Sequence, residues 1–263
     1  MIDTLNATQF HSVISSGKTK PARLVCEDAN GRSFEVVAKL SAACEQGVMN
    51  LAAEAVGACL AADLGLPVPC PYAVQLDAEF IDEIPNDEWR ERARASSPLA
   101  FGSTVVPAGF RQWTTADRIS QDMVAEALAI FTFDALTFNP DRRSANPNCF
   151  VRGDALRVFD HELSFSHRVI LFWRPPWQMG SLHSLETDGA HIFRSNLQRR
   201  PLDLAPVRAA WAAISDERLE EYRRAVPLEW AAADGFVDAA LSLISSVRDN
   251  IDDCLVEVGR VLR

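Results

Sequence analysis

The chain has 263 residues, of which 48% are hydrophobic and 24% are charged, a composition that suits one large globular domain or two closely packed lobes. Its net charge of −10 disfavours binding to nucleic acid or to an anionic membrane through bulk charge. The N-terminus is too polar for a secretory signal, and no apolar run reaches membrane-spanning length. The six cysteines form no C-x-x-C pair, so we expect a reduced, cytoplasmic protein.

The first hundred residues are rich in strand-forming residues. Three strands are predicted there, at residues 23–27, 34–40 and 72–76. The first two are joined by Asp-Ala-Asn-Gly at 28–31, a good hairpin turn because Asn-Gly tolerates positive φ. A polar stretch that contains a glycine, residues 15–19, precedes them. An alanine-rich helix is predicted from 49 to 64, where Gly65 ends it.

The rest of the chain has mainly helical patterns. Residues 77–97 are predicted to form a short helix and a connection, and residues 99–106 a strand that leads out of the first lobe. Four further helices are predicted, at 121–138, 204–214, 216–225 and 235–261. After the first of these come a polar turn, 139–148, and a tight hairpin formed by the apolar segments 149–151 and 156–159.

This order of elements predicts an α+β fold with two lobes. A smaller, β-rich N-terminal lobe would span residues 1–103, and a larger helical lobe residues 104–263. The cleft between two such lobes is the usual place for a ligand, so we expect the candidate site there.

Three residues of the second lobe have the chemistry that phosphoryl transfer needs. Asp141 lies in the polar turn, Asn146 follows five residues later, and Asp160 follows the hairpin. An aspartate in a loop can orient an acceptor hydroxyl or accept its proton. A carboxamide and a second carboxylate, brought together by a short hairpin, can bind Mg²⁺ through oxygen.

Two residues of the first lobe complete the pattern. The chain has only three lysines, and Lys39 is the one that lies in a predicted strand. Glu54 is the only acid between Glu45 and Asp63, in the alanine-rich helix. A lysine and a glutamate so placed can pair across a strand–helix contact and leave the ammonium facing phosphates. The backbone amides of the 15–19 turn could cover those phosphates.

Each of these features also has a purely structural explanation. An aspartate beside proline often supports a turn, a strand lysine often marks a sheet edge, and a helix glutamate usually faces solvent. The ordered set favours the chemical interpretation, because a glycine turn, a strand lysine, a helix glutamate, Asp-x₄-Asn, a hairpin and an aspartate follow one another in the order that phosphoryl transfer uses.

The motifs around these residues resemble those of the HipA-like kinases, which share the protein-kinase-like fold with the phosphatidylinositol kinases. The resemblance covers roughly residues 12 to 250, and its main motifs are Phe-Asp-Ala-Leu at 133–136, Asn-Pro-Asp-Arg-Arg at 139–143, Asn-Pro-Asn at 146–148 and Val-Phe-Asp-His-Glu at 158–162. The chain differs from many kinases at two places. Asn139 stands where they have histidine, and His161-Glu162 follows Asp160 where they have Phe-Gly.

The resemblance implies a bilobal protein-kinase-like fold that binds ATP and Mg²⁺ in the cleft. It implies that Asp141 is the catalytic aspartate, that Asn146 and Asp160 bind Mg²⁺, and that Lys39, with Glu54 as its partner, contacts the ATP phosphates. The implied phosphate loop comprises Ser16, Gly17, Lys18 and Thr19, and the implied adenine-facing hinge comprises Phe101, Gly102 and Ser103.

These features lead to one main hypothesis and two alternatives. The main hypothesis is a kinase that transfers the γ-phosphoryl group to a Ser/Thr hydroxyl of a protein substrate, or to its own residues Ser15, Ser16 or Thr19. A small-molecule or lipid kinase, or a nucleotidyl transferase, is an alternative because nothing in the sequence identifies the acceptor. The other alternative is a nucleotide-binding pseudokinase that acts as an interaction module.

Two further groups of residues have two interpretations each. His161, beside Asp160, is interpreted as a structural histidine rather than as a group that assists metal or phosphate binding. The loop that contains Trp173, Arg174 and Trp177 is either a packed lid or a platform for the substrate, since tryptophan and arginine are common interface anchors.

Overall fold

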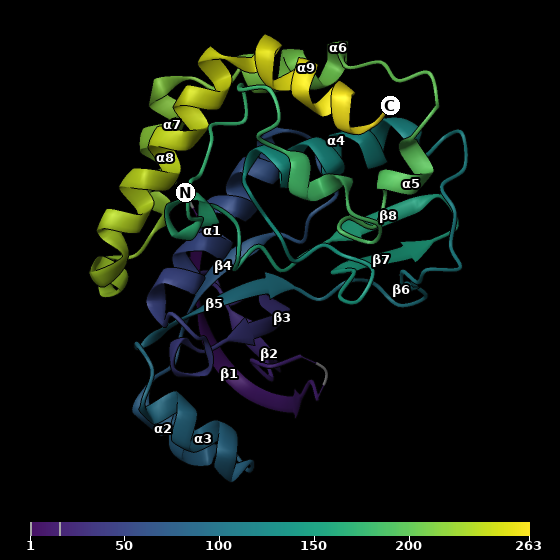
Figure 1. Cartoon of the computed structure of the whole chain (residues 1–263). Coiled ribbons are helices and arrows are strands. Elements are labelled where there is room, and N and C mark those ends of the chain that lie inside the picture. Colours follow the sequence, from purple (N-terminus) through teal and green to yellow (C-terminus); the bar gives the residue numbers. More distant parts are fainter. Residues whose placement is uncertain (1, 16) are drawn as a thin grey trace. The chain divides into compact units, whose positions relative to one another are not determined.

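The structure is a computed structural model that describes residues 2–15 and 17–263. The chain folds into two compact units (Figure 1). The first, the barrel unit, comprises Met1–Cys59, Pro69–Val106 and Glu221–Val237. The second, the helical unit, comprises Leu60–Val68, Pro107–Glu220 and Asp238–Arg263. The protein thus has a β-rich N-terminal part and a helical C-terminal part, which is consistent with a kinase-like fold.

The barrel unit is built on a closed barrel of five strands in the order β1-β2-β3-β5-β4. The strands are β1 (Asp3–Val13), β2 (Ala22–Glu27), β3 (Ser33–Lys39), β4 (Pro71–Gln75) and β5 (Leu99–Thr104). Neighbours pair in antiparallel fashion except β1 and β4, whose parallel pairing closes the barrel. Two register shifts in β1, between Ala7 and Gln9 and between Phe10 and Ser12, bend this long strand around it.

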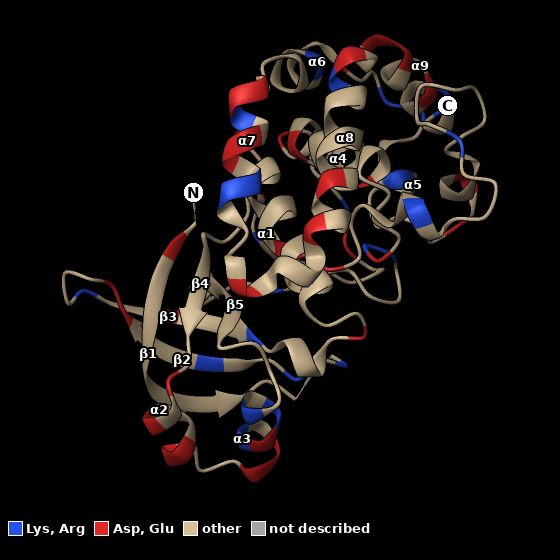
Figure 2. Ribbon diagram, turned by 90° about the vertical axis from the view of Figure 1, so that its left-hand side faces the viewer, with Lys and Arg blue, Asp and Glu red and all other residues tan. Residues whose placement is uncertain are grey.

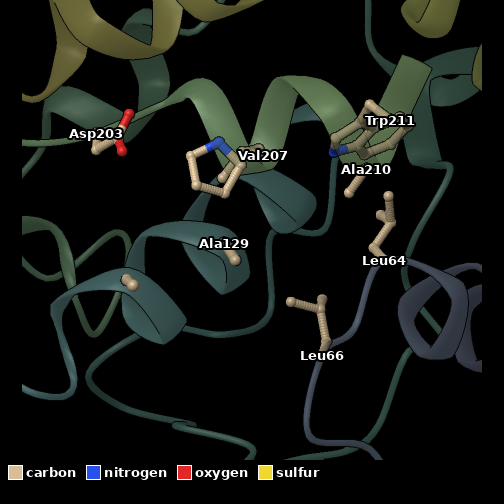
Figure 3. Close-up of a pocket in the computed structure, with 9 residues that line it drawn as sticks. Leu64, Leu66, Ala129, Asp203, Val207, Ala210 and Trp211 are labelled. Atoms are coloured by element: carbon tan, nitrogen blue, oxygen red, sulfur yellow. The ribbon is translucent and has the colours of Figure 1, made fainter. Parts of the chain in front are cut away.

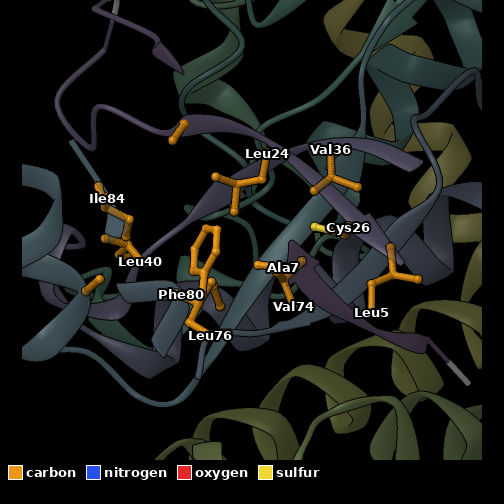
Figure 4. Close-up of a cluster of buried hydrophobic side chains, with 14 of the residues drawn as sticks. Leu5, Ala7, Leu24, Cys26, Val36, Leu40, Val74, Leu76, Phe80 and Ile84 are labelled. Carbon is orange, nitrogen blue, oxygen red and sulfur yellow. The ribbon is translucent and has the colours of Figure 1, made fainter. Parts of the chain in front are cut away.

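Apolar side chains of all five strands fill the barrel (Figure 4). Two helices pack onto the same core, α2 (Ala78–Glu83) and α3 (Asp87–Arg94). They contribute Phe80 of α2, Ile84 directly after it, and Trp89 of α3. Asp77 and Asn86 cap these two helices by accepting hydrogen bonds from the amides of Phe80 and Trp89. Acids in the first turn of α3 and arginines in its last turn match the helix dipole (Figure 2).

Most predicted elements of this part are confirmed. β2, β3, β4 and β5 lie within one or two residues of the predicted strands, and α1 (Val48–Asp63) lies within one residue of the predicted helix 49–64 at each end. Residues 77–97 form two helices instead of one. The first strand, β1, was not predicted, because its sequence is mostly polar and only two of its residues, Leu5 and Ala7, are buried.

The helical unit contains a small antiparallel sheet, β6-β7-β8. Its strands are β6 (Arg111–Gln112), β7 (Cys149–Arg152) and β8 (Ala155–Val158). The helices are α4 (Val124–Leu136), α5 (Arg194–Leu197), α6 (Ala205–Ala212), α7 (Asp216–Ala225), α8 (Asp234–Asp249) and α9 (Ile251–Val261), where α7 and α8 begin or end in the barrel unit. Short 3₁₀ turns are η1 (Ser41–Ala43, barrel unit), η2 (Ser166–Val169), η3 (His183–Glu186) and η4 (Leu228–Ala233, barrel unit).

The predicted hairpin and the predicted buried helix of this unit are confirmed as β7–β8 and α4. The single helix predicted over 235–261 is wrong: it is two helices that break at Asn250. Asn250 has φ −118° and ψ 26°, and its side-chain amide donates to the carbonyl oxygen of Ser246 at 2.8 Å. A side chain that bonds the local backbone competes with the helical ladder, which explains the break.

One stretch, Leu228–Asp249, is long and apolar enough to cross a membrane by length and composition alone. Buried helices of globular proteins pass the same test. Trp230 at its start is fully buried and donates to the carbonyl oxygen of Leu99 at 2.9 Å, and Asp234 and Asp238 interrupt its apolar run. The stretch is therefore weak support for a membrane span.

A small pocket of about 110 Å³ lies between α4, α6 and the segment after α1 (Figure 3). It is lined by Leu64, Leu66, Ala125, Ala129, Asp203, Pro206, Val207, Ala210 and Trp211. An apolar lining with a single carboxylate is unsuited to phosphate groups, so this pocket is not the candidate site.

Candidate active site

The turn between α4 and β7 holds Asp141 through two side-chain amides. Asn146 Nδ2 donates to Asp141 Oδ2 at 2.7 Å, and Asn148 Nδ2 donates to the same oxygen at 3.0 Å. The turn is closed by the amide of Arg143, which donates to the carbonyl oxygens of Asp141 at 2.9 Å and of Asn146 at 3.1 Å. The Asp-x₄-Asn spacing therefore brings Asp141 and Asn146 into direct contact.

These hydrogen bonds determine which oxygen atoms are left for other partners. Asp141 receives both amides on Oδ2, so Oδ1 lies outside these two bonds, 3.9 Å from Arg143 Nε. Asn146 donates through its nitrogen, so its amide oxygen, the atom that a hard cation prefers, lies outside this bond as well. Asp141 Oδ1 and the amide oxygen of Asn146 are thus the atoms of these two side chains that lie outside the hydrogen bonds between them.

Arg142, the residue after Asp141, is completely buried and connects the parts of the site. Its Nε donates to Asp134 Oδ2 at 2.6 Å, which ties the turn to α4. Its Nη1 donates to the carbonyl oxygen of Asn148 and, at 3.2 Å, to that of Phe159, the residue before Asp160. One guanidinium thus bridges α4, the turn and the end of β8.

Asp134 is the acceptor on which this network depends. Besides Arg142 it accepts hydrogen bonds from Asn139 Nδ2 at 2.8 Å and from His191 Nε2 at 3.1 Å. Burial by itself raises the pKa of this carboxyl, but the charge of Arg142 and the hydrogen bond from His191 outweigh it and keep the pKa below its ordinary range. Asp134 is therefore ionised, and its charge is paired with Arg142.

A distant segment, residues 189–193, is fastened onto the same turn. The Ser144 amide donates to the carbonyl oxygen of Gly189 at 3.0 Å, and the Ile192 amide donates to that of Arg142 at 3.2 Å. The Phe193 amide donates to His191 Nδ1 at 3.1 Å, so the ring proton is on Nε2, where it bonds Asp134. Burial lowers the pKa of His191, which keeps this ring neutral.

Two carboxylates follow β8. Asp160 has a φ of 65°, and its carboxylate oxygens approach those of Glu162 to within 4.8 Å. A left-handed conformation is uncommon for residues other than glycine and occurs mainly in turns and at functional sites. Two acids at this spacing, with the amide oxygen of Asn146 in the same unit, are the oxygen ligands that Mg²⁺ takes, so these residues fit the metal that the sequence implies.

His161 packs edge-on against the ring of Phe133, with 5.4 Å between ring centroids, and is 2% exposed. This buried aromatic contact is what a structural histidine makes, in line with the interpretation from the sequence.

In the barrel unit, Lys39 at the end of β3 forms an ion pair with Glu54 of α1. Both side chains are buried, so the glutamate does not face solvent as most helix glutamates do. Taking two charges out of water is costly, and the cost is offset only when the charges are paired. The pair that the sequence predicts across a strand–helix contact is therefore present.

The predicted phosphate loop connects β1 and β2. Ser16 lies outside the described residues. Gly17 has φ 92°, which favours glycine, and Lys18 is exposed while Thr19 is half-buried. A function of these residues in phosphate binding stays a prediction.

The predicted hinge residues lie in β5. Phe101, Gly102 and Ser103 pair with Lys39, Ala38 and Val37 of β3, so the lysine strand and the predicted hinge are direct neighbours. Phe101 is buried. A Cβ on Gly102 would lie 2.5 Å from Val74 Cγ2, so this position needs glycine for the packing of β5 against β4 whatever it binds.

Sequence reasoning missed one residue of this network, His191, and quoted Asp134, Arg142 and Asn148 only as parts of motifs. Asp134 is an acid in an otherwise apolar helix, and Arg142 follows the catalytic candidate directly, so both had a signal in the sequence. His191 and Asn148 had none: His191 is 57 residues from Asp134, and an asparagine in a polar turn is unremarkable by itself.

A comparison with protein-family models identifies the family. The model described as HipA-like kinase matches residues 8–257. The chain belongs to the HipA-like kinase family. No curated protein matches the chain. As a HipA-like kinase it is expected to be a phosphotransferase, and its predicted site residues divide between the two units, with Lys39 and Glu54 in the barrel unit and Asp141, Asn146 and Asp160 in the helical unit.

Proposed function

We propose that this HipA-like kinase uses ATP and Mg²⁺ to phosphorylate a Ser or Thr hydroxyl of a protein, including hydroxyls of its own chain. The observation that carries the proposal is the contact between Asp141 and Asn146 in a chain of a kinase family. Protein phosphorylation is an expectation from that family, because the acceptor leaves no signature in the residues of the turn.

Asp141 would orient the acceptor hydroxyl and accept its proton. The hydroxyl oxygen then bonds to the γ-phosphorus, the bond from that phosphorus to the bridging oxygen breaks, and ADP leaves. Oδ1 of Asp141 suits this step because Oδ2 is engaged by Asn146 and Asn148. The two amides keep the carboxylate in one orientation, which favours an in-line approach of the hydroxyl.

Mg²⁺ would be bound by Asp160 and Asn146, with Glu162 as a further carboxylate beside Asp160. The metal supplies charge neutralisation on the phosphate oxygens. In the barrel unit, Glu54 would keep Lys39 extended toward the α- and β-phosphates, with the 17–19 turn covering them. Phe101, Gly102 and Ser103 would lie against the adenine.

All six cysteines are free thiols, and burial raises the pKa of Cys26, Cys149 and Cys254 to about 12, so these three stay protonated. Buried thiols that stay protonated are in keeping with the expectation of a cytoplasmic protein.

The first test is the thermal stability of the protein with ATP and Mg²⁺. A ligand that binds only the folded state stabilises it by roughly 2.7 kcal/mol at a hundredfold excess over its dissociation constant. We expect a Mg²⁺-dependent rise in Tm for the wild type that Asp160→Asn loses, because the substitution removes the charge from a metal ligand. Asp154→Asn, on an exposed acid of the β7–β8 turn, is the matched control.

Transfer is tested with labelled ATP. Asp141→Ala is expected to retain the nucleotide-dependent rise in Tm and to lose phosphoryl transfer by a factor of 10² or more, a magnitude typical of general acid–base groups. Nucleotide binding with no transfer to any protein, lipid or small acceptor would instead identify a pseudokinase. The absence of any nucleotide effect on Tm would contradict the proposal altogether.

A further inference from the structure

An exposed apolar segment follows the proposed metal-binding residues of the helical unit. Val169, Leu171, Phe172 and Met179 are 75%, 81%, 88% and 82% exposed. We call residues 169–179 the apolar loop. Large apolar side chains that gather in one short segment in water mark an interaction surface more often than single exposed ones do.

The base of the apolar loop is bonded to the segment that leads into the catalytic turn. The Phe165 amide donates to the carbonyl oxygen of Thr137 at 2.6 Å, and Ser166 Oγ donates to that of Phe138 at 2.7 Å. The ring of Trp173 meets that of Phe138 with 5.7 Å between centroids. Because Thr137 and Phe138 come four and three residues before Asp141, respectively, the base of the loop is held close in the chain to the reacting group.

The backbone of the loop is also unfavourable for its residues. Phe172 has φ 57° and Phe165 at its base has φ 61°. A left-handed conformation costs roughly 1–2 kcal/mol for residues other than glycine. Phe172 thus combines a strained backbone with a side chain exposed to water, and neither feature stabilises the isolated chain. Strain of this kind is a reason to look for a function.

The charge of the loop's own stretch of sequence, residues 163–185, is opposite in sign to that of the whole chain. No acid occurs between Glu162 and Glu186, although the chain carries a net charge of −10. Arg168 and Arg174 are exposed at the two ends of the run Val-Ile-Leu-Phe-Trp. The loop therefore presents apolar side chains between two basic ones, and its complement has apolar side chains flanked by acids.

We propose that the apolar loop is the docking surface for the protein acceptor, and that it binds an extended segment with apolar residues and acidic neighbours around the hydroxyl. The proposal rests on the proposed function for the fate of that hydroxyl, while the binding itself is independent of it. Because the loop is bonded to the residues before Asp141, a docked segment lies where its hydroxyl can reach that carboxylate.

A polypeptide suits these observations better than a lipid surface does. Membrane binding through bulk charge is disfavoured for a chain of net charge −10, and two arginines contribute little attraction to anionic lipid. A short peptide can satisfy both the apolar tip and the two flanking charges at once. Membrane binding is therefore treated as a competing outcome of the test.

The test measures binding of fluorescent peptides to the full chain by anisotropy, without nucleotide. One peptide series carries a central serine with leucine or phenylalanine and aspartate or glutamate as neighbours. A matched series has lysine in place of the acids, and a third has alanine in place of the apolar residues. The variants are Leu171→Ser, Phe172→Ser and Arg174→Glu, with Leu228→Ser as control because Leu228 is 90% exposed and lies outside the loop.

We expect the wild type to bind the first series, whose peptides carry both apolar residues and acids. Each loop variant should bind that series about tenfold more weakly, because it lacks one anchor of the interface. Leu228→Ser should bind like the wild type. Circular dichroism melting curves check that each variant is folded. We expect all of them to fold, because the substituted side chains are exposed. Arg174→Glu should shift preference toward the lysine series, which a general loss of structure would not do.

Two results overturn the proposal. One is that folded loop variants bind the peptides as the wild type does, or that the wild type binds none of them. The other is that vesicles of phosphatidylcholine and phosphatidylserine bind the wild type but not Leu171→Ser, while the peptides bind these two proteins equally well. Failure of the proposed function is separate, since it appears as the absence of a Tm shift with Mg²⁺ and ATP in the wild type.

Discussion

Arg142 donates a hydrogen bond to the carbonyl oxygen of Phe159 at 3.2 Å, and so links the residue after Asp141 to the residue before Asp160. The two carboxylates to which the catalytic and metal-binding functions are assigned lie on different sides of the β7–β8 hairpin. Their spacing is maintained by a buried guanidinium that is itself held by Asp134. Arg142 therefore positions the site without needing to contact a substrate.

Arg142→Lys is expected to abolish most phosphoryl transfer even though the charge is kept. Lysine has no planar fork and cannot bond Asp134, Asn148 and Phe159 together. Breaking a buried ion pair typically costs about 3–5 kcal/mol, so the free energy of unfolding of Arg142→Lys should fall by part of that amount. Urea unfolding measures the stability, and transfer from labelled ATP measures the activity. A variant with wild-type activity would show that the arginine only supports the fold elsewhere.

The double variant Asp134→Leu with Arg142→Met separates positioning from stability. Replacing both members of a buried ion pair with apolar residues is often neutral for stability. We expect the double variant to be more stable than Arg142→Met alone and to remain inactive. Recovery of activity together with stability would mean that the network has no function in positioning.

His191 makes the stability of the helical unit depend on pH. Burial lowers the pKa of the folded histidine below its ordinary value of 6.5. The unfolded chain therefore binds a proton that the folded chain does not, and stability is complete above pH 6.5 and falls as the pH drops below it. We expect the free energy of unfolding, measured with urea at pH 7.5 and at pH 5.5, to be lower at the acidic value.

His191→Gln should reduce the difference in unfolding free energy between the two pH values, because glutamine can donate to Asp134 but does not titrate. The pKa of His167 is also lowered by burial, so it adds a dependence of the same sign. His167→Gln is the matched variant. An unchanged pH dependence in His191→Gln would show that His191 binds the same number of protons in the folded and the unfolded chain over this pH range, which would contradict the prediction.

Glu54→Gln is expected to weaken nucleotide binding and to lower stability, while leaving the size of the side chain nearly unchanged. The substitution removes the charge of Glu54 from its ion pair with the buried Lys39 ammonium, and breaking one side of a buried ion pair is more costly than losing both charges. Lys39→Met with Glu54→Gln should therefore recover stability but not nucleotide binding. Tm with and without Mg²⁺ and ATP measures both effects in one experiment, and a full nucleotide shift in Glu54→Gln would contradict this assignment.

Local patterns predicted much of the fold and of the candidate site. The hairpin at 28–31, the buried helix α4 and the β7–β8 hairpin depend on residues close in sequence, and the structure has each of them. The contact between Asp141 and Asn146 is also local, since five residues in a turn return the chain on itself. The pair of Lys39 with Glu54 was predictable because a lysine in a strand and an acid in an apolar helix are both unusual.

Relationships between distant residues were not predictable in this way. The barrel closes through parallel pairing of β1 with β4, residues 3–6 with 72–75, and no local pattern indicates which strand is the partner. His191 donates a hydrogen bond to Asp134 from a segment without regular structure, and nothing in the sequence around it distinguishes it from the other histidines. Only the packing of the whole unit places it there.

Gly102 separates two explanations for the glycine in the predicted hinge. A Cβ at this position would lie 2.5 Å from Val74 Cγ2, a distance that real Cβ atoms do not tolerate. Gly102→Ala should therefore lower the stability of the barrel unit by about 1–3 kcal/mol, as overpacking does. Val74→Ala removes the obstructing methyl group, so the double variant should be more stable than the sum of the two single changes predicts.

The nucleotide response of the same variants decides whether Gly102 also faces the adenine. If barrel packing alone requires glycine, the double variant regains the wild-type shift in Tm with Mg²⁺ and ATP. If the adenine ring also needs the space, the double variant folds and still loses that shift. Urea unfolding is measured for the wild type, the two single variants and the double variant. It shows which of them are folded, so that nucleotide binding is compared on folded protein only.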